Sequence, residues 1–460
     1  MLVAGCFFME ILDGTIVTTA APRIGDSLGV PSTAVSLVIT AYLVTLAVLI
    51  PVSGWVAARW GGRSVFLTAI ALFTVASIGC ASSQTLAELV AMRVLQGAGG
   101  AMMVPVGRLV ILARTAKSEL MAVMSFLVWP ALIAPVFAPL VGGAITTYAS
   151  WHWIFLINVP LGLIAFLAAL RLIQSPPMPS PPPLDHLGVL LGGGGLACLT
   201  YTAHLLSQAS TDWTLTVAFA VATVALLPAA TLHLLGTDFP LVNLRTLRIE
   251  TFAASMGGSA IFWLAVGAVP FLLPLLFQEV FGWSPIKSGA MVLVLFLGNV
   301  GIKPTTTFLY GRYGFRAILL VATLGLTATL VATAFLTAST PLYLIGVVIL
   351  LGGVTRSIGL TGYNTLAFAD VPSDEMRGAN TLQATNQQLA GGLGVAVGAV
   401  LLRLGQALGF NLGGIGASPA FVVAFLSLAA LALVAGVGAA NIDPAAGDVL
   451  RTRHRRDQSR

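Results

Sequence analysis

The chain is 460 residues long, and 57% of its residues are hydrophobic while only 8% are charged. Soluble domains carry about 25% charged residues, so this composition excludes a soluble fold. The formal net charge is +6, but five arginines lie in the last ten residues and the other basic residues are scattered between apolar runs. This distribution favours a membrane protein over a nucleic-acid-binding protein.

A membrane-spanning helix needs about 20 mostly apolar residues. The first apolar run has no basic n-region and contains Glu10 and Asp13, so it is interpreted as a span rather than a signal peptide. The chain then starts almost inside the membrane, as expected if relatives carry a short cytoplasmic leader before it. In chain order, we expect fourteen spans near residues 1–21, 34–58, 64–82, 86–112, 120–147, 152–173, 187–207, 214–235, 251–278, 287–310, 315–337, 341–368, 378–404 and 418–440.

Basic residues are distributed unevenly between the loops on the two sides. With the N-terminus inside, fifteen Arg and Lys residues fall in the inner loops and the tail, and only Arg23, Lys287 and Arg403 fall outside. The positive-inside rule then predicts that both termini face the cytoplasm.

Two breaks divide the predicted spans. Residues 174–186 contain six prolines, which favour an extended spacer, and a second break runs from Gly236 to Glu250. We therefore expect a six-helix bundle at 1–173, a proline-rich cytoplasmic linker with two inserted helices at 174–250, a second six-helix bundle at 251–440 and a basic cytoplasmic tail at 441–460.

An internal repeat supports this division. Val56–Arg63 follows the second span of the first half, and Leu309–Arg316 follows the second span of the other half. Both segments read aliphatic, any, small, Arg, aromatic, Gly, any, Arg. Their identical placement predicts a duplicated bundle.

Four segments of the first half place polar residues, Pro or Gly in apolar surroundings. They are Leu12–Val17 with Ala20, Ala21 and Pro22; Gly54–Arg63; Leu89, Arg93, Gln96, Gly97, Gly99 and Ala101; and Ala134–Gly143. These motifs resemble those of the major facilitator superfamily, specifically its fourteen-helix drug:proton antiporter branch of the EmrB/QacA type. The resemblance implies an all-α integral membrane fold with two six-helix bundles plus two inserted helices, in a bacterial inner membrane.

The match to the family's loop motif is partial. Gly54, Arg59, Gly61 and Arg63 match, but Ala58 replaces the acidic residue and Gly62 replaces a basic one. The family's charge latch therefore cannot be carried over intact. Ordinary inside-positive charge is the alternative for Arg63.

The resemblance in the fifth span implies an antiporter motif. Pro135 and Pro139 would bend the helix, while Gly142 and Gly143 would allow close packing. A packing bend without functional meaning is the alternative. A weaker resemblance covers Trp151–Pro160, where His152 replaces the usual arginine and is interpreted as structural.

Several polar residues in otherwise apolar spans are candidates for the substrate cavity. A charge inside the bilayer is costly, which suggests that it faces a cavity or a partner. Three amides share one helix face by their i, i+3, i+4 spacing, with interhelical hydrogen bonding as the alternative. The candidates are Arg93, Arg356, Gln383, Asn386 and Gln387.

Asp13, assisted by Glu10, is the candidate proton-coupling carboxylate. The two residues are three positions apart and share a helix face, and Asp13 lies near mid-membrane. Desolvation would favour its protonated form, so it could exchange a proton during transport. A structural ion pair of Asp13 with Arg93 or Arg356 is the alternative.

Enzyme signatures are absent from the sequence: there is no Gly-rich phosphate loop, no pair of metal-ligating histidines and no Gly-x-Ser-x-Gly motif. Cys6, Cys80 and Cys198 lie in apolar segments, with a number and spacing that argue against disulfides and a zinc site. We therefore expect no enzyme activity, no metal and no cofactor, with transport driven by a proton gradient.

The leading hypothesis is proton-coupled efflux of small amphipathic or cationic organic compounds by alternating access, with a monomeric transport unit. Its expected partners are the substrate, protons, the lipid bilayer and, as a further candidate, a periplasmic adaptor protein, with no nucleic acid. Proton-coupled nutrient uptake and export of an endogenous metabolite are alternatives. A membrane-embedded enzyme or lipid translocase is a third, although the residues form no recognisable catalytic set.

Overall fold

A computed structural model describes residues 2–112, 120–173, 183–208, 210–372, 375–408 and 417–441. Every regular element in these ranges is helical. The chain divides into two compact units, one comprising Met1–Leu241 with Trp283–Ala290 and the other Val242–Gly282 with Met291–Arg460. Each unit is described by itself.

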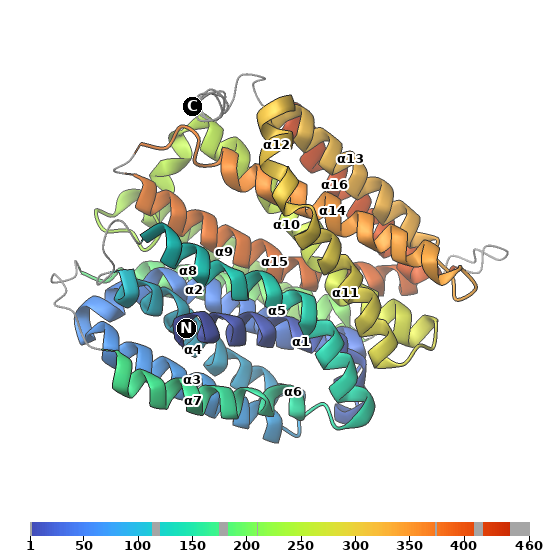
Figure 1. Ribbon diagram of the computed structural model, residues 1–460, viewed down its shortest axis with the longest axis horizontal. Helices are drawn as coiled ribbons and strands as arrows, with labels where there is room; N and C mark the ends of the chain where they lie inside the picture. The colour runs from blue at the N-terminus through green and yellow to red at the C-terminus, as the bar shows by residue number, and fades with distance from the viewer. Residues whose placement is uncertain are drawn as a thin grey trace. The chain divides into compact units, whose positions relative to one another are not determined.

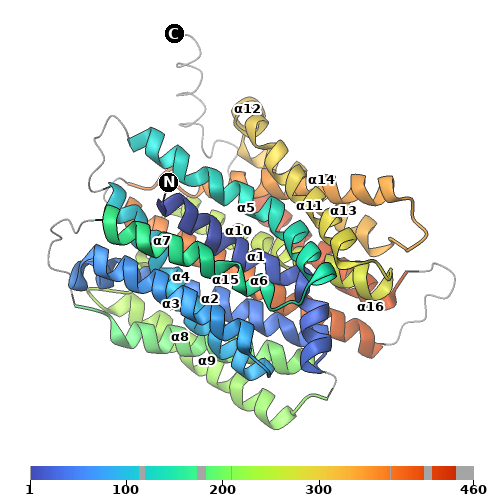
Figure 2. The same ribbon diagram turned by 60° about the horizontal axis from the view of Figure 1, so that its bottom comes forward.

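The first unit holds nine α-helices and a short 3-10 turn in its described part. Helix α3 packs against α4 and α7, α1 against α5, and α2 against α4. Helices α8 and α9 form an antiparallel pair, and α8 also packs on α2 (Figures 1 and 2). The elements are α1 (Leu2–Leu28), η1 (Ser32–Val35), α2 (Ser36–Trp60), α3 (Gly62–Ser82), α4 (Leu86–Leu112), α5 (Leu120–Tyr148), α6 (Trp153–Leu156), α7 (Asn158–Leu172), α8 (His186–Ser207) and α9 (Trp213–Gly236).

In the second unit, α10 packs against α15 and α16, while α13 packs against α14 and α16 (Figure 1). The first residues of α11 belong to the first unit. The elements are η2 (Leu244–Arg248), α10 (Glu250–Leu275), the π-helical turn η3 (Leu276–Val280), α11 (Pro285–Gly301), α12 (Lys303–Tyr313), α13 (Phe315–Ala334), α14 (Leu342–Leu366), α15 (Met376–Leu408) and α16 (Pro419–Ala440).

The predicted all-α membrane architecture is confirmed. Among the described residues, thirteen helices are long and apolar enough to cross a membrane, and Ile133–Tyr148 is a shorter apolar helix within α5. The proline-rich segment 174–182 and the tail 442–460 lie outside the described residues.

Three predicted spans have different boundaries or breaks. The first does not end at residue 21, because α1 continues through Pro22 to Leu28. The span predicted at 152–173 is interrupted at Ile157, between α6 and α7. The span predicted at 287–310 is divided at Ile302, just before Pro304, whose ring and missing N–H disfavour continuation of the preceding helix.

In both repeated segments a glycine with a positive φ ends one helix and precedes the next. Gly61 ends α2 with φ 83° and precedes α3, and Gly314 ends α12 with φ 82° and precedes α13. Side chains with a Cβ rarely adopt this left-handed region, so each turn requires glycine. The repeat detected in the sequence is therefore also a structural repeat.

Candidate functional site

Asp13 and Arg93 form an ion pair inside the first unit. Asp13 lies on α1 and Arg93 on α4, and both side chains are 0% exposed. Nη1 of Arg93 donates to Oδ2 of Asp13 at 2.5 Å. Because an unpaired buried charge is costly, each residue compensates the other. The ion pair that was one alternative for Asp13 is therefore present, and its partner is Arg93.

Three more polar side chains complete the network around Asp13. Nε2 of Gln96 and Nδ2 of Asn158 donate to Oδ1 of Asp13 at 2.9 and 2.7 Å. Gln96 also accepts from Arg93 at 2.7 Å and donates to Ser77 at 2.7 Å. Both carboxylate oxygens thus accept hydrogen bonds, and the network connects α1, α3, α4 and α7.

Aromatic rings hold the Arg93 guanidinium in place. Its Cζ atom lies 4.0 Å from the centroid of the Tyr42 ring and 5.7 Å from that of Phe155. Nε donates to the Val38 carbonyl at 3.3 Å, whereas Nη2 has no hydrogen-bond partner among the described residues. Arg93 is therefore fixed from α2 as well as from α1, with one donor uncommitted.

Glu10 lies one helical turn before Asp13 and has a different environment. Its side chain is buried, and Oε2 has no hydrogen-bond partner among the described residues. Arg108 on α4 is near enough for its charge to attract that of Glu10, and its guanidinium also lies 4.6 Å from the Phe7 ring centroid. Glu10 is thus the less tightly bonded of the two carboxylates.

The loop-motif residues make few contacts. Nη2 of Arg63 donates to the Leu170 carbonyl at 2.7 Å and so links α3 to α7. Arg59 and Gly54 are exposed, and a Cβ at Gly54 would meet no atom within 4 Å. Arg63 therefore has a specific structural contact, while Gly54 is not a close-packing position.

The antiporter-motif glycines are close-packing positions. A Cβ at Gly142 would lie 2.9 Å from Cγ1 and from the carbonyl oxygen of Ile16 on α1. One at Gly143 would overlap the Pro285 carbonyl and lie 2.9 Å from Cα of Ile286. Thr147 strengthens this contact by accepting a hydrogen bond from the Ile286 N–H at 3.1 Å. Pro135 and Pro139 lie on the same helix, α5.

In the second unit, the three predicted amides contact neighbouring helices. Gln383 and Gln387 both donate to Oδ1 of Asn364 on α14, at 2.8 and 2.6 Å. Asn386 donates to Ser259 on α10 at 3.1 Å. Interhelical hydrogen bonding, the alternative for these amides, is therefore present. No hydrogen bond among the described residues joins them to Arg356.

The inserted pair is fastened at one end by Asp185. Its side chain accepts from the N–H groups of Gly188 and Leu241 at 2.7 and 3.1 Å, and Oδ1 lies 2.7 Å from Nε2 of His233. Burial alone would raise the pKa of Asp185, but these hydrogen bonds and the His233 charge together lower it. The Asp185 clasp, defined as Asp185 with Gly188, His233 and Leu241, connects the start of α8 to the end of α9.

A family model described as Major Facilitator Superfamily matches residues 3–395. The chain belongs to this superfamily. Over 460 residues it is 36% identical to a protein of Klebsiella pneumoniae named "Putative multidrug resistance protein MdtD", covering 99% of this chain and 97% of that protein. The proteins of the same name in Cronobacter sakazakii and Escherichia coli are 39% and 38% identical, covering 87% and 88% of this chain and 85% of each relative. The predicted drug:proton antiporter family is confirmed.

Solved structures of major facilitator proteins share the fold. A D-xylose-proton symporter superposes with a TM-score of 0.68 at 13% identity, covering 97% of this chain and 98% of that one. A mutant of the nucleoside transporter NupG gives 0.67 at 14% identity, covering 95% and 98%. These structures show the fold alone, whereas the match to the superfamily and to the MdtD proteins makes the chain a multi-pass membrane transporter rather than an enzyme.

Sequence reasoning missed several residues of this facilitator's polar networks. Asn158, Ser77 and Tyr42 contact the Asp13–Arg93 pair or its network directly, and Asn364 joins two of the amides. Asn158 could have been identified from the sequence, because it is a polar residue in an apolar segment, which is the signal that identified Arg93. Ser77 and Tyr42 carried no such signal, because both types are common in membrane helices.

Proposed function

We propose that this protein is a secondary active transporter that exports small amphipathic or cationic organic compounds in exchange for protons, by alternating access. The similarity to MdtD proteins over nearly the whole chain supports drug efflux. The fifteen-to-three distribution of basic residues supports an inner-membrane orientation with both termini in the cytoplasm. No organic cofactor or metal takes part in the proposed cycle, and the transport unit is a monomer.

The observation that carries the proton-coupling proposal is the difference between Asp13 and Glu10 on α1. Both oxygens of Asp13 accept hydrogen bonds, from Arg93 at one oxygen and from Gln96 and Asn158 at the other. Glu10 has an oxygen without such a donor among the described residues. A proton can therefore be accommodated at Glu10 without breaking the network, whereas protonation of Asp13 requires Arg93 to move away.

This requirement gives Asp13 two alternative states. In one state it is paired with Arg93, as in this structure. In the other it is protonated, and the released guanidinium must find another partner or face water. A conformational change can be coupled to proton binding because the two states have different contacts. Glu10, one helical turn away, is the proposed entry point for the proton.

The charges also suggest how substrate and proton could compete. A cationic substrate near α1 would be stabilised by an ionised Glu10 and repelled once Arg93 is released. Proton uptake from the outside would therefore favour release of the substrate there. Proton loss to the inside would restore the negative charge and favour rebinding. One short segment of α1 could thus couple the two flows.

Transport in everted membrane vesicles tests this function. An imposed pH gradient, acidic inside, should drive accumulation of a fluorescent lipophilic cation, and a protonophore should abolish it. A vesicle preparation without the protein controls for passive uptake. Accumulation driven only by the opposite gradient would favour proton-coupled uptake, and accumulation unaffected by the protonophore would contradict proton coupling. Reconstitution of the purified protein without an adaptor protein tests whether the chain transports by itself.

A further inference from the structure

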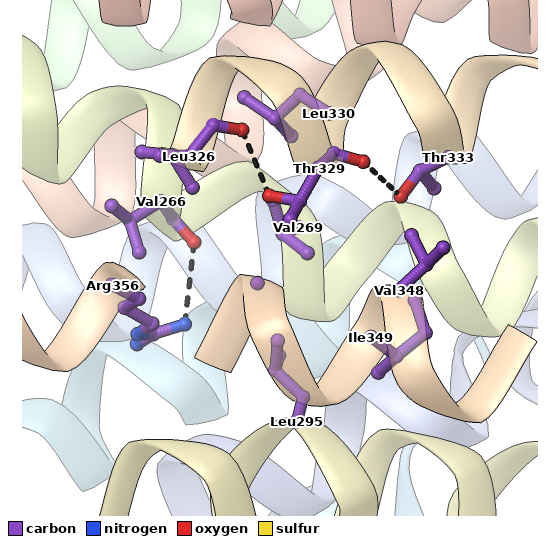
Figure 3. A pocket seen from close by; sticks show the side chains of 11 residues that line it. Val266, Val269, Leu295, Leu326, Thr329, Leu330, Thr333, Val348, Ile349 and Arg356 are labelled. Carbon is purple, nitrogen blue, oxygen red and sulfur yellow. Dashed lines mark hydrogen bonds between the residues drawn. The ribbon is translucent and has the colours of Figure 1, made fainter. Parts of the chain in front are cut away.

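A cavity in the second unit, lined in part by Arg356, is too small to hold an organic ligand. Its volume is about 20 Å³, which is room for about one water molecule. Figure 3 shows Arg356 beside Val266, whose carbonyl accepts a hydrogen bond from Nη1 of the arginine at 3.4 Å. Arg356 therefore offers no ligand site inside this unit, in contrast to Arg63 at the surface of the first unit.

Arg63 is held by one nitrogen atom and keeps another without a partner. It is the second residue of α3, and its Nη2 donates to the Leu170 carbonyl in the last turn of α7 at 2.7 Å. Its Nε is buried and has no hydrogen-bond partner among the described residues. Arg171, the residue after Leu170, is exposed. The contact thus brings two arginines together where α3 begins and α7 ends.

No carboxylate on the neighbouring helices compensates these two charges. The sequence has no Asp or Glu between residues 27 and 87 or between residues 120 and 184, which include α2, α3, α5 and α7. Helix α4, which also packs against α3, has its carboxylate in the first turn, at Glu88, and this turn follows the end of α3 rather than its start. Ala58 stands where the family's loop motif has an acidic residue. Arg63 and Arg171 therefore form a locally uncompensated positive site.

An exposed apolar stripe on α7 leads to this positive site. Leu163, Leu167 and Leu170 are spaced by four and three residues, so they share one face of the helix. Their side chains are 40–56% exposed. Helix α7 lies beside α3 (Figure 1), and the buried Gly162 packs against Thr74 of that helix. The leucine stripe is therefore outside this helix contact and is open to a hydrocarbon chain.

The equivalent turn of the second unit lacks this arrangement. Arg316 is the second residue of α13, as Arg63 is of α3. Helix α16 packs against α13 as α7 packs against α3, but it has no basic residue in its last turn. The pair of arginines on two packed helices is thus a feature of the first repeat rather than a consequence of the repeated turn itself.

We propose that the start of α3 and the end of α7 bind an anionic phospholipid, with its phosphate on Arg63 and Arg171 and an acyl chain along the leucine stripe. A guanidinium matches phosphate oxygens through parallel charge-assisted hydrogen bonds. Leu163 and Arg171 are eight residues apart, about 12 Å along the helix, which is close to the thickness of one leaflet of the hydrocarbon core, about 15 Å. The lipid site is separate from the Asp13 network and does not depend on the proposed efflux function.

Native mass spectrometry of the purified full-length protein, titrated with lipid in a non-ionic detergent, tests the proposal. The first bound dioleoyl phosphatidylglycerol, which is anionic, should bind at least about 5-fold more tightly than dioleoyl phosphatidylcholine, which has the same chains without net charge. Glycerol phosphate, which has the charge but no chains, should not compete. This arm separates a phospholipid site from a site for free phosphate.

Substitutions of the arginines locate the site. Arg171→Gln should weaken phosphatidylglycerol binding roughly 5-fold, and Arg63→Gln/Arg171→Gln roughly 25-fold, because each basic residue contributes a similar attraction to an anionic lipid. Arg63→Lys keeps the charge but lacks the planar fork, so it should also bind more weakly than the wild type. Arg23→Gln is the matched control: Arg23 is an exposed arginine of the same unit with Asp26 one helical turn away, and its loss should leave binding unchanged.

The lipid-free proteins separate lipid binding from a structural role. Arg63→Gln also removes the contact with Leu170, but Arg171 makes no ion pair or hydrogen bond through its side chain within the described part of the chain. Arg171→Gln should therefore unfold at the wild-type temperature without lipid and gain less stability from phosphatidylglycerol. A lower lipid-free unfolding temperature for this variant would assign Arg171 a structural role and overturn the proposal.

Three binding results would also contradict the lipid site. They are equal affinity of the wild type for the two phospholipids, wild-type affinity in the double variant, and an equal loss of binding in Arg23→Gln, which would indicate an effect of net charge alone. None of these measurements involves transport. Failure here therefore leaves the efflux proposal to its own test.

Discussion

Nη1 of Arg93 on α4 lies 2.5 Å from Oδ2 of Asp13 on α1, and neither side chain is exposed to solvent. Eighty residues of chain separate them, so the contact links α1 to α4, two helices far apart in the sequence. Gln96 and Asn158 extend the contact to α7 and leave Asp13 with donors at both oxygens. How stable this network is, and how readily it opens, decides whether it is a structural contact or part of proton coupling.

Removal of one member of the pair should be more harmful than removal of both. Arg93→Ala leaves the buried Asp13 carboxylate without its cation, and breaking a buried pair in this way costs about 3–5 kcal/mol. The double variant Arg93→Ala/Asp13→Ala removes both charges and should recover part of the loss, which thermal unfolding in detergent measures as a coupling energy. Strictly additive losses would show that the two side chains do not interact.

Gly143→Leu should abolish export while membrane insertion and expression remain near normal. Its side chain would collide with backbone atoms of Pro285 and Ile286, and overpacking costs about 1–3 kcal/mol in any state that contains this contact. Such a cost shifts a two-state equilibrium roughly 5- to 150-fold. Gly5→Leu is the matched control, because a Cβ there meets no atom within 4 Å. Normal export by Gly143→Leu would show that the antiporter motif serves only for helix packing and has no role in transport.

The Asp185 clasp should make stability depend on pH only in the acid range. Its pKa is lowered in the folded protein, so its contribution is complete above the unfolded pKa of about 3.9 and is lost as pH falls through the lower folded value. Asp185→Ala removes the helix cap as well and should cost about 0.5–2 kcal/mol near neutral pH. Thermal unfolding of both proteins between pH 7 and strongly acidic pH measures the difference. If the difference in stability between the wild type and Asp185→Ala is the same under strongly acidic conditions as at neutral pH, Asp185 is not ionised in the folded state.

The topology can be tested with single cysteines introduced into a background in which Cys6, Cys80 and Cys198 are replaced by Ser. Ser180→Cys, in the proline-rich linker, should react with an impermeant thiol reagent only after the cells are opened. Ser210→Cys, in the loop between α8 and α9, should react in intact cells, because that loop is predicted to face outward. Labelling of Ser180→Cys in intact cells would reverse the orientation inferred from the basic residues.

The family and most of the helices could be predicted from the sequence, because membrane spans and glycine turns have strong local sequence signals. The repeated turns at Gly61 and Gly314 show this, since one residue type satisfies one backbone requirement in both places. The break at Ile302 was missed because hydropathy continues across it, although Pro304 disfavours a continuous helix.

Partnerships between distant residues were harder to predict. Asp13 was compatible with either Arg93 or Arg356, and only packing of α1 on α4 selects Arg93. The three amides on α15 follow one helix face, yet they divide between Asn364 on α14 and Ser259 on α10. A periodic pattern defines the face of a helix but not the helix that it contacts. The roles of these residues in transport stay predictions.

Asp13→Asn in the vesicle assay tests the central claim most directly, with Glu10→Gln measured in parallel. Asparagine keeps the size of the side chain and much of its hydrogen bonding but cannot exchange a proton. We predict that Asp13→Asn is expressed and inserted, yet loses accumulation driven by the pH gradient, and that Glu10→Gln lowers it and changes its pH dependence. Full proton-driven export by a normally expressed Asp13→Asn protein would contradict the account and leave Asp13 as a structural partner of Arg93.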